Sequence, residues 1–152
     1  MANNLLKQGY PLVVFDLNAA AVAAAVAKGA QSASSPADVA LKTSTIVTML
    51  PSSPHVRSVY LTDASSLLHG LKRRADGGKS ALLLDSSTID PTAARAVAAE
   101  LKSATGGATM LDTPVSGGVL VRPCSSPLLQ FYFVLICMSL HLSVDRAPRP
   151  PP

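Results

Sequence analysis

Short continuous apolar runs alternate along the chain with segments whose apolar residues recur at helical spacing. The apolar runs cover residues 12–15, 45–50, 81–84 and 108–111. A run of this length without polar alternation is typical of a strand that is buried on both faces, as in a parallel sheet. Because these runs alternate with helical segments, the pattern predicts an α/β fold with a doubly wound parallel sheet.

Capping residues mark the predicted helix ends. Asn18 is placed to cap an Ala-rich helix over residues 19–28, and Ser35, Ser53 and Asp90 each precede a proline, which suits the first turn of a helix. Gly9 stands where a glycine closes a helix. The segment from Leu67 through the basic triplet to the Gly-Gly pair is predicted to be a loop. The apolar residues expected to face the core from the helices are Val22, Val26, Val56, Val59, Tyr60, Ala94, Val97, Ala98 and Leu101.

Composition restricts the core and the possible partners. The 152 residues suit about one domain; 48% are hydrophobic and only 4% aromatic, so the core must consist of Ala, Val and Leu. The net charge of +4 rests partly on residues 72–74, which lack interleaved aromatics and predict a solvated loop, with no nucleic-acid partner. The two cysteines have no zinc-site spacing, so no metal is expected.

Targeting and membrane signals are weak. The N-terminal residues have the pattern of neither a signal peptide nor an Arg-rich transit peptide. The longest apolar run, residues 128–142, is short for a membrane span of roughly 20 residues, so a membrane-associated fragment is not the favoured interpretation.

The stretch Asp-Thr-Pro-Val-Ser-Gly-Gly at residues 112–118 follows the last predicted strand of the main body. Open α/β sheets bind ligands at the carboxyl edge of their strands. Gly117 and Gly118 allow close approach of a ligand to main-chain N–H groups, and Ser116 adds a hydroxyl donor. Such a loop suits a small carboxylate; a plain Gly-Gly turn is the alternative.

Three motifs, in this order and spacing, resemble the 3-hydroxyisobutyrate dehydrogenase family of β-hydroxyacid dehydrogenases. They are Met-Leu-Pro at residues 49–51, Asp-Ser-Ser-Thr-Ile-Asp-Pro at 85–91, and the stretch at 112–118. The resemblance covers residues 1–118 and implies a Rossmann-like NAD(P)-binding domain, while residues 119–152 form a divergent, unrelated apolar tail. It also implies NAD as cofactor, a small hydroxy acid as substrate, and possible homo-oligomers among full-length relatives.

The resemblance also implies roles for individual residues. Asp16, at the end of the second family strand, would hold the adenosine ribose hydroxyls and favour NAD over NADP. Leu50 and Pro51 would line the cofactor path, and Thr88 would contact the nicotinamide half. The substrate carboxylate would be held by Ser116, Gly117 and Gly118. His55 stands where relatives often carry Asn, and we interpret it as an exposed residue of a first helical turn.

Two family features have no counterpart in the sequence. The family's first strand and its Gly-x-Gly-x-x-Gly turn are missing, so dinucleotide affinity is expected to be weak. The helical domain with the family's catalytic lysine is also missing, so no residue is assigned a catalytic role. The missing strand is central, which leaves residues 12–15 and 46–50 facing a gap of about 9.6 Å.

Two interpretations of the apolar tail stay open. Residues 130–138 are rich in β-forming residues and could occupy the central gap. Alternatively, and this is the interpretation we prefer on sequence grounds, the tail is unevolved sequence from a gene-model or splicing artefact.

The leading functional hypothesis is an incomplete 3-hydroxyisobutyrate dehydrogenase. By resemblance, such an enzyme oxidises 3-hydroxyisobutyrate to methylmalonate semialdehyde with NAD in mitochondrial valine catabolism, but this chain is expected to be inactive as written. One alternative is a related NADPH-dependent glyoxylate or succinic semialdehyde reductase, against which Asp16 argues. The other is a non-catalytic fragment that pairs with full-length subunits through an exposed sheet edge.

Overall fold

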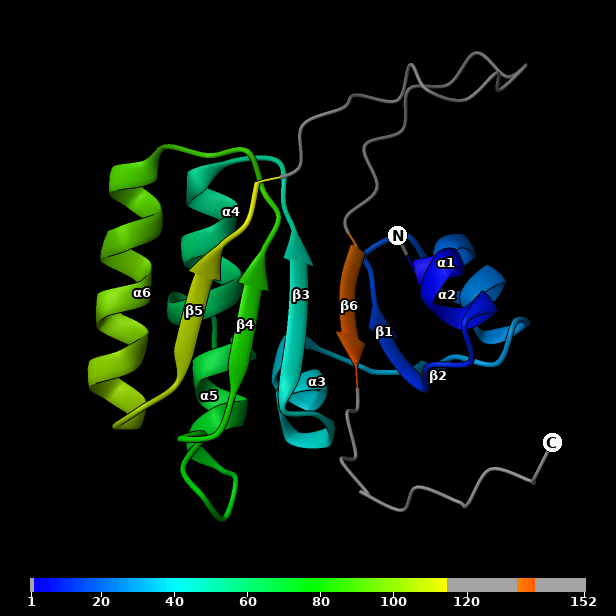
Figure 1. The fold of residues 1–152 in the computed structure, drawn as a ribbon, viewed down its shortest axis with the longest axis horizontal. Helices are drawn as coiled ribbons and strands as arrows, with labels where there is room; N and C mark the ends of the chain where they lie inside the picture. The colour runs from blue at the N-terminus through cyan, green and yellow to red at the C-terminus, as the bar shows by residue number, and fades with distance from the viewer. Residues whose placement is uncertain (1, 115–133, 139–152) are drawn as a thin grey trace, which may run out of the picture.

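A computed structural model describes residues 2–114 and 134–138, which form a six-stranded sheet packed against helices (Figure 1). The strand order is β2-β1-β6-β3-β4-β5. The strands are β1 (Leu12–Phe15), β2 (Gln31–Ser32), β3 (Thr45–Met49), β4 (Leu82–Asp85), β5 (Thr109–Asp112) and β6 (Val134–Met138). The helices are α1 (Ala2–Lys7), α2 (Ala19–Val26), α3 (Pro36–Lys42), α4 (Ser53–Arg57), the π-helical turn η1 (Ser58–Thr62), α5 (Leu67–Lys72) and α6 (Pro91–Thr105).

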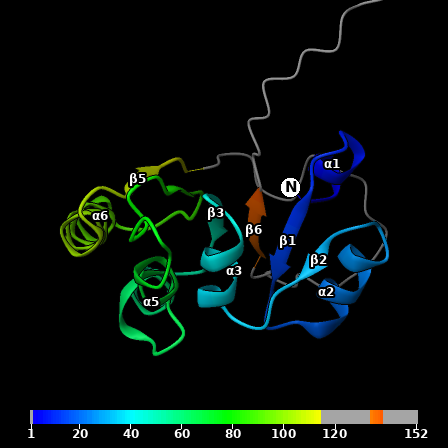
Figure 2. The ribbon, with the colours of Figure 1, turned by 90° about the horizontal axis from the view of Figure 1, so that it is seen from below.

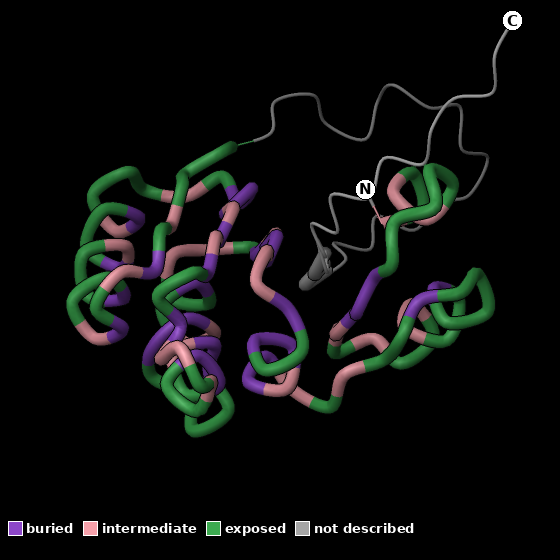
Figure 3. Tube along the Cα trace, turned by 60° about the horizontal axis from the view of Figure 1, so that its bottom comes forward, coloured by how far each residue is buried: buried purple, intermediate pink, exposed green. Residues whose placement is uncertain are grey.

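The predicted α/β fold with a doubly wound sheet is confirmed. All strand pairs of the sheet are parallel except those made by β6. One core cluster joins Val13, Ile46 and Leu83 of the strands to residues of α3, α5 and α6, which lie together on one side of β3–β5 (Figure 2). A second cluster joins Leu12 and Val14 to α1 and α2. Alternate residues of β1 thus join clusters on opposite faces of the sheet, as the period of a strand requires. Figure 3 marks buried positions both along the strands and on the helices.

The central gap that the sequence predicts between β1 and β3 is filled by β6. This strand runs antiparallel to both neighbours, with Cys137 at the register position of Val13 on one side and Ile46 on the other. For residues 134–138 the structure therefore agrees with the interpretation that we ranked second from sequence. The main-chain groups of β1 and β3 that face this gap therefore pair with a segment of the same chain.

The capping predictions are largely confirmed. Asn18 accepts hydrogen bonds from the N–H groups of Ala20 and Ala21, and the side chain of Ser35 accepts from the N–H of Asp38. Asp90 caps α6 in the same way, through the N–H of Thr92. Local sequence signals therefore fix the starts of α2, α3 and α6, because each capping side chain satisfies a donor that the helix itself leaves free.

Three local predictions were wrong. The first part of the predicted loop, Leu67–Lys72, is helix α5, and only the residues after it form turns. The N-cap of α4 is Ser52, which leaves Ser53 inside the helix. Val26 is 43% exposed, and the neighbouring Ala25 is buried in its place. In α2, which is almost entirely alanine and valine, the apolar pattern is too uniform to say which side faces the core.

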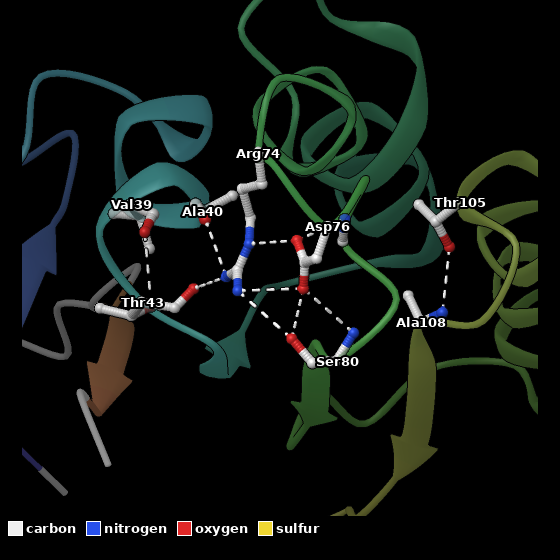
Figure 4. Close-up of polar contacts among 9 residues, drawn as sticks. Val39, Ala40, Thr43, Arg74, Asp76, Ser80, Thr105 and Ala108 are labelled. Atoms are coloured by element: carbon white, nitrogen blue, oxygen red, sulfur yellow. Dashed lines mark hydrogen bonds and ion pairs between the residues drawn. The ribbon is translucent and has the colours of Figure 1, made fainter. Parts of the chain in front are cut away.

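The basic triplet is not a uniformly solvated loop. Lys72 ends α5, and the Arg74 side chain is only 17% exposed. Its guanidinium donates to the carbonyl oxygens of Thr43 and Ala40 and pairs with Asp76 (Figure 4). Arg74 therefore joins the turn after α5 to the C-terminal end of α3, where the last carbonyls of a helix need donors.

Within the described residues, no helix has the length and apolar character of a membrane span. The same part of the chain contains no group of His, Cys, Asp and Glu side chains arranged to hold a metal ion.

Candidate functional site at the carboxyl edge of the sheet

The carboxyl ends of β1, β3, β4 and β5 lie at one edge of the sheet, where the strand arrows of β3, β4 and β5 point upward in Figure 1. The chain passes from β1 to β2 on one side of β6 and from β3 to β5 on the other. The position of β6 is thus the topological switch point, outside which open α/β sheets bind their ligands. Of the predicted site residues, Asp16 lies on one side of this point, and Leu50, Pro51 and Thr88 lie on the other.

Asp16 has a buried carboxylate oxygen that no donor of the described residues satisfies. Its Oδ1 accepts from the N–H of Asn18 at 2.8 Å, which forms a tight turn into α2. Its Oδ2 is buried and has no hydrogen-bond partner among the described residues. Burial raises the pKa of Asp16 above the usual 3.8, and main-chain hydrogen bonds from Asn18 and Leu17 oppose the shift. A buried acceptor without a donor fits a ribose hydroxyl.

Leu50 and Pro51 follow β3 and differ in exposure. The Leu50 side chain is 5% exposed and belongs to the core, and its N–H donates to Oγ of Ser87 at 2.8 Å. Pro51 is exposed. The Leu50 N–H is therefore used within the protein, which leaves Pro51 and the main chain beyond it as the exposed part of the predicted cofactor path.

The turns after β4 and β5 are joined to each other. Thr88 is exposed, directly after the buried Ser87. Both the N–H and the Oγ1 of Thr113 donate to the carbonyl oxygen of Asp85, at 2.8 and 3.1 Å. The chain thus leaves β5 beside the turn that carries Thr88. The predicted substrate residues, Ser116, Gly117 and Gly118, lie outside the described residues.

A buried polar network that sequence reasoning missed lies beneath this edge. Thr48 Oγ1 donates to Oδ1 of Asp85 at 2.9 Å and lies 2.6 Å from the Tyr60 hydroxyl. The same oxygen of Asp85 accepts from the N–H and the hydroxyl of Ser87. Burial raises the pKa of Tyr60 well above its usual value, and the negative charge of Asp85 adds to the shift. The only sequence signal was Thr48, a polar residue within an apolar run.

The site fits one part of a dinucleotide better than another. Asp16 suits the adenosine ribose. A pyrophosphate, by contrast, needs main-chain donors at a Gly-rich turn leading into a helix, and the sequence has no Gly-x-Gly-x-x-Gly pattern. At the switch point β6 runs in the opposite direction, so its first residue, Val134, lies level with Met49 near the carboxyl edge. Among the described residues this position therefore has no strand-to-helix turn.

Comparison with known proteins decides the family. A family model described as the NAD binding domain of 6-phosphogluconate dehydrogenase matches residues 1–121. The chain belongs to this family. The match covers the elements that surround the site, from α1 to the end of β5, and the cofactor of the domain is a nicotinamide dinucleotide.

Individual relatives agree with this assignment. The mitochondrial 3-hydroxyisobutyrate dehydrogenase of Rattus norvegicus is 45% identical over 119 residues, which cover 78% of this chain and 33% of the rat protein. The NAD-dependent L-serine dehydrogenase of Pseudomonas aeruginosa is 46% identical over 118 residues, which cover 78% of this chain and 37% of that protein. The chain thus spans about a third of the length of these relatives.

A solved structure shows the same fold. The 3-hydroxyisobutyrate dehydrogenase of Mycobacterium tuberculosis, determined with L-serine, matches with a TM-score of 0.64 and 33% identity. The match covers 78% of this chain and 37% of the other. The resemblance predicted from the three motifs is therefore confirmed at the level of family and fold.

Proposed function

We propose that this chain is the dinucleotide-binding part of an NAD-dependent dehydrogenase for 3-hydroxy carboxylic acids. Two substrate names among the relatives, 3-hydroxyisobutyrate and L-serine, share a primary hydroxyl on the carbon β to a carboxylate. Of the two, 3-hydroxyisobutyrate is the leading candidate because more of the relatives carry its name. With this substrate, the place of the enzyme is valine catabolism in the mitochondrion.

The proposal rests on the Oδ2 of Asp16 at the switch-point edge, which is buried and has no hydrogen-bond partner among the described residues. A ribose diol bound there supplies the donor that this oxygen lacks, and desolvation strengthens such a bond. A 2′-phosphate at the same place sets two negative groups against each other in a half-buried position. Both effects favour NAD over NADP, and they argue against the alternative of an NADPH-dependent reductase.

We infer a division of labour in which this part binds cofactor and does not by itself complete the reaction. Hydride transfer from the hydroxyl carbon to a nicotinamide ring needs a group that accepts the hydroxyl proton. No described side chain is placed for that step at the edge formed by Pro51 and Thr88. Ser116, Gly117 and Gly118 remain the proposed holders of the substrate carboxylate. The 152-residue chain is therefore expected to bind NAD weakly and to form no NADH from 3-hydroxyisobutyrate.

Calorimetry or ligand-observed NMR with NAD and NADP tests the proposal. We expect the unmodified chain to bind NAD weakly, but more tightly than NADP. We expect Asp16→Asn to weaken NAD binding by about tenfold and to reduce the ratio of the NAD affinity to the NADP affinity. The matched control is Glu100→Gln, which likewise removes one negative charge, but from an exposed side chain on α6. It should leave the affinities for NAD and NADP unchanged. Equal binding of both cofactors by the unmodified chain, no effect of Asp16→Asn, or no binding of either cofactor contradicts the proposal.

A further inference from the structure

The network beneath the site has a defined direction of hydrogen bonding. Thr48 donates its hydroxyl proton to Asp85, so the Tyr60 hydroxyl must donate to Thr48. Ser87 donates its hydroxyl proton to Asp85 and accepts the N–H of Leu50. The result is one continuous series of bonds, which begins in η1, crosses the ends of β3 and β4, and returns to the main chain of Leu50.

Burying Asp85 in this network costs folding free energy, which is not expected of a residue that serves stability alone. Asp85 is fully buried, yet its Oδ2 has no hydrogen-bond partner among the described residues. A buried, half-satisfied carboxylate lowers stability relative to a well-packed apolar group. Such costs are expected where a group serves a site, and the network lies directly beneath the turns that carry Pro51 and Thr88.

We propose that Tyr60, Thr48 and Asp85 are positioning residues for the dinucleotide path. They hold Ser87 in place, and Ser87 in turn fixes the Leu50 N–H and so the Leu50–Pro51 turn relative to the turn that carries Thr88. None of the three residues touches the ligand in this scheme. The role in cofactor binding rests on the proposed function, whereas the control of the turn can be measured without any ligand.

Exposed contacts alone do not join the two turns as firmly. At the strand ends, the N–H of Ser86 donates to the carbonyl oxygen of Thr48 at 2.8 Å. Beyond the strand ends, the N–H of Asp90 donates to Oγ of Ser53 at 3.4 Å, close to the limit for such a bond. The buried network should therefore govern the spacing of the two turns.

Thr48→Val and Tyr60→Phe test the proposal, alone and combined. Each removes a hydroxyl at nearly constant volume. Thr105→Val is the matched control, because Thr105 is also a buried threonine with hydrogen bonds to main-chain atoms, but it lies at the opposite edge of the sheet (Figure 4). The readouts are hydrogen exchange at the Leu50 amide in the ligand-free chain and the Kd for NAD.

We expect Thr48→Val to speed exchange at Leu50 and to raise the Kd by roughly 2- to 30-fold, the range for residues that act through a network. Tyr60→Phe should act in the same direction, and the double variant should show less than the sum, because the two hydroxyls form one bond. Thr105→Val should change neither readout.

The two proposals fail in different ways. If Thr48→Val changes Leu50 exchange no more than Thr105→Val does, the positioning role is overturned, whatever the Kd shows. If exchange changes as expected but the unmodified chain binds no NAD, the proposed function fails, and the control of the turn stands.

Discussion

The guanidinium Nη1 of Arg74 donates to the main-chain carbonyl oxygen of Thr43 at 2.6 Å. Thr43 is the C-cap of α3. A side chain that follows α5 in the sequence therefore supplies a hydrogen-bond donor to the C-terminal end of α3. We predict that Arg74→Met lowers the free energy of unfolding by about 2 kcal/mol, because a charged donor is lost from a part-buried carbonyl. Thermal unfolding should show a fall of about 4–8 °C for a chain of this size. Arg73→Met, an exposed neighbour, is the control and should change the midpoint little.

Asp76 predicts an acid-sensitive turn. The pKa of Asp76 is strongly lowered, first by the hydroxyl of Ser80 and then by the N–H of Gly78, with a further contribution from Arg74. A lowered pKa in the folded state means that the carboxylate stabilises the fold above its ordinary pKa of 3.8, and that this contribution is lost as the pH falls below that value. Urea unfolding measures the free energy of unfolding at each pH. Between about pH 6 and about pH 3, this free energy should fall less for Asp76→Asn than for the unmodified chain. Parallel curves for the two proteins would rule out this role.

Gly70 predicts a tight helix contact. A Cβ atom on Gly70 of α5 would lie 2.3 Å from the carbonyl oxygen of Ala37 in α3. Gly70→Ala should therefore destabilise the chain by about 1–3 kcal/mol, even though alanine favours a helix by about 1 kcal/mol. Gly107→Ala, whose added Cβ meets atoms no closer than 3.5 Å, is the control and should stay within about 0.5 kcal/mol of the unmodified chain. If Gly70→Ala lowers the free energy of unfolding no more than Gly107→Ala does, α3 and α5 are not packed this closely.

The central strand β6 predicts a cross-linking pattern. Cys137 is the direct partner of Val13 on one side and of Ile46 on the other. Only one of these two pairs can be of the non-hydrogen-bonded kind, in which the side chains of the two residues lie closer together and so favour a disulfide. We predict that one of Val13→Cys and Ile46→Cys forms an intramolecular disulfide with Cys137 in a Cys124→Ser background.

Matched controls fix the register of β6. Val14→Cys and Val47→Cys face Ile136 in register and should not cross-link. Mass spectrometry of peptides and non-reducing gels give the readout. Cross-linking at Val14 would show a shifted register, and a disulfide found only in dimers would show that the strand comes from a second molecule.

The sequence was sufficient for elements whose signals are local. Asn18, Ser35 and Asp90 cap helices as predicted, and Gly9 has the positive φ of 80° that a closing glycine adopts. The strands β1 and β3 were found because both of their faces are buried. For β5 the expected burial was wrong, because this strand lies at the end of the sheet and its Leu111 is 46% exposed. The family and the fold followed from three motifs that stand at three neighbouring strand ends.

Features that depend on distant partners could not be predicted. Helix α5 is short and contains Gly70, which weakens a helix on its own; it forms against Ala37, some thirty residues away. Tyr60 looked like a core residue, and its hydroxyl partner Thr48 lies on another element. Periodicity reports which residues are buried, but it does not report which buried polar atoms meet.

A nicotinamide dinucleotide should bind at the carboxyl edge of this sheet, and amide chemical-shift mapping measures such binding residue by residue. We expect NAD to shift the amide signals around Asp16, at residues 50–53 and at residues 86–89. Signals at the opposite edge, around Gly78 and Gly107, should stay in place. Shifts confined to the opposite edge, or no shifts at millimolar NAD, would contradict this expectation.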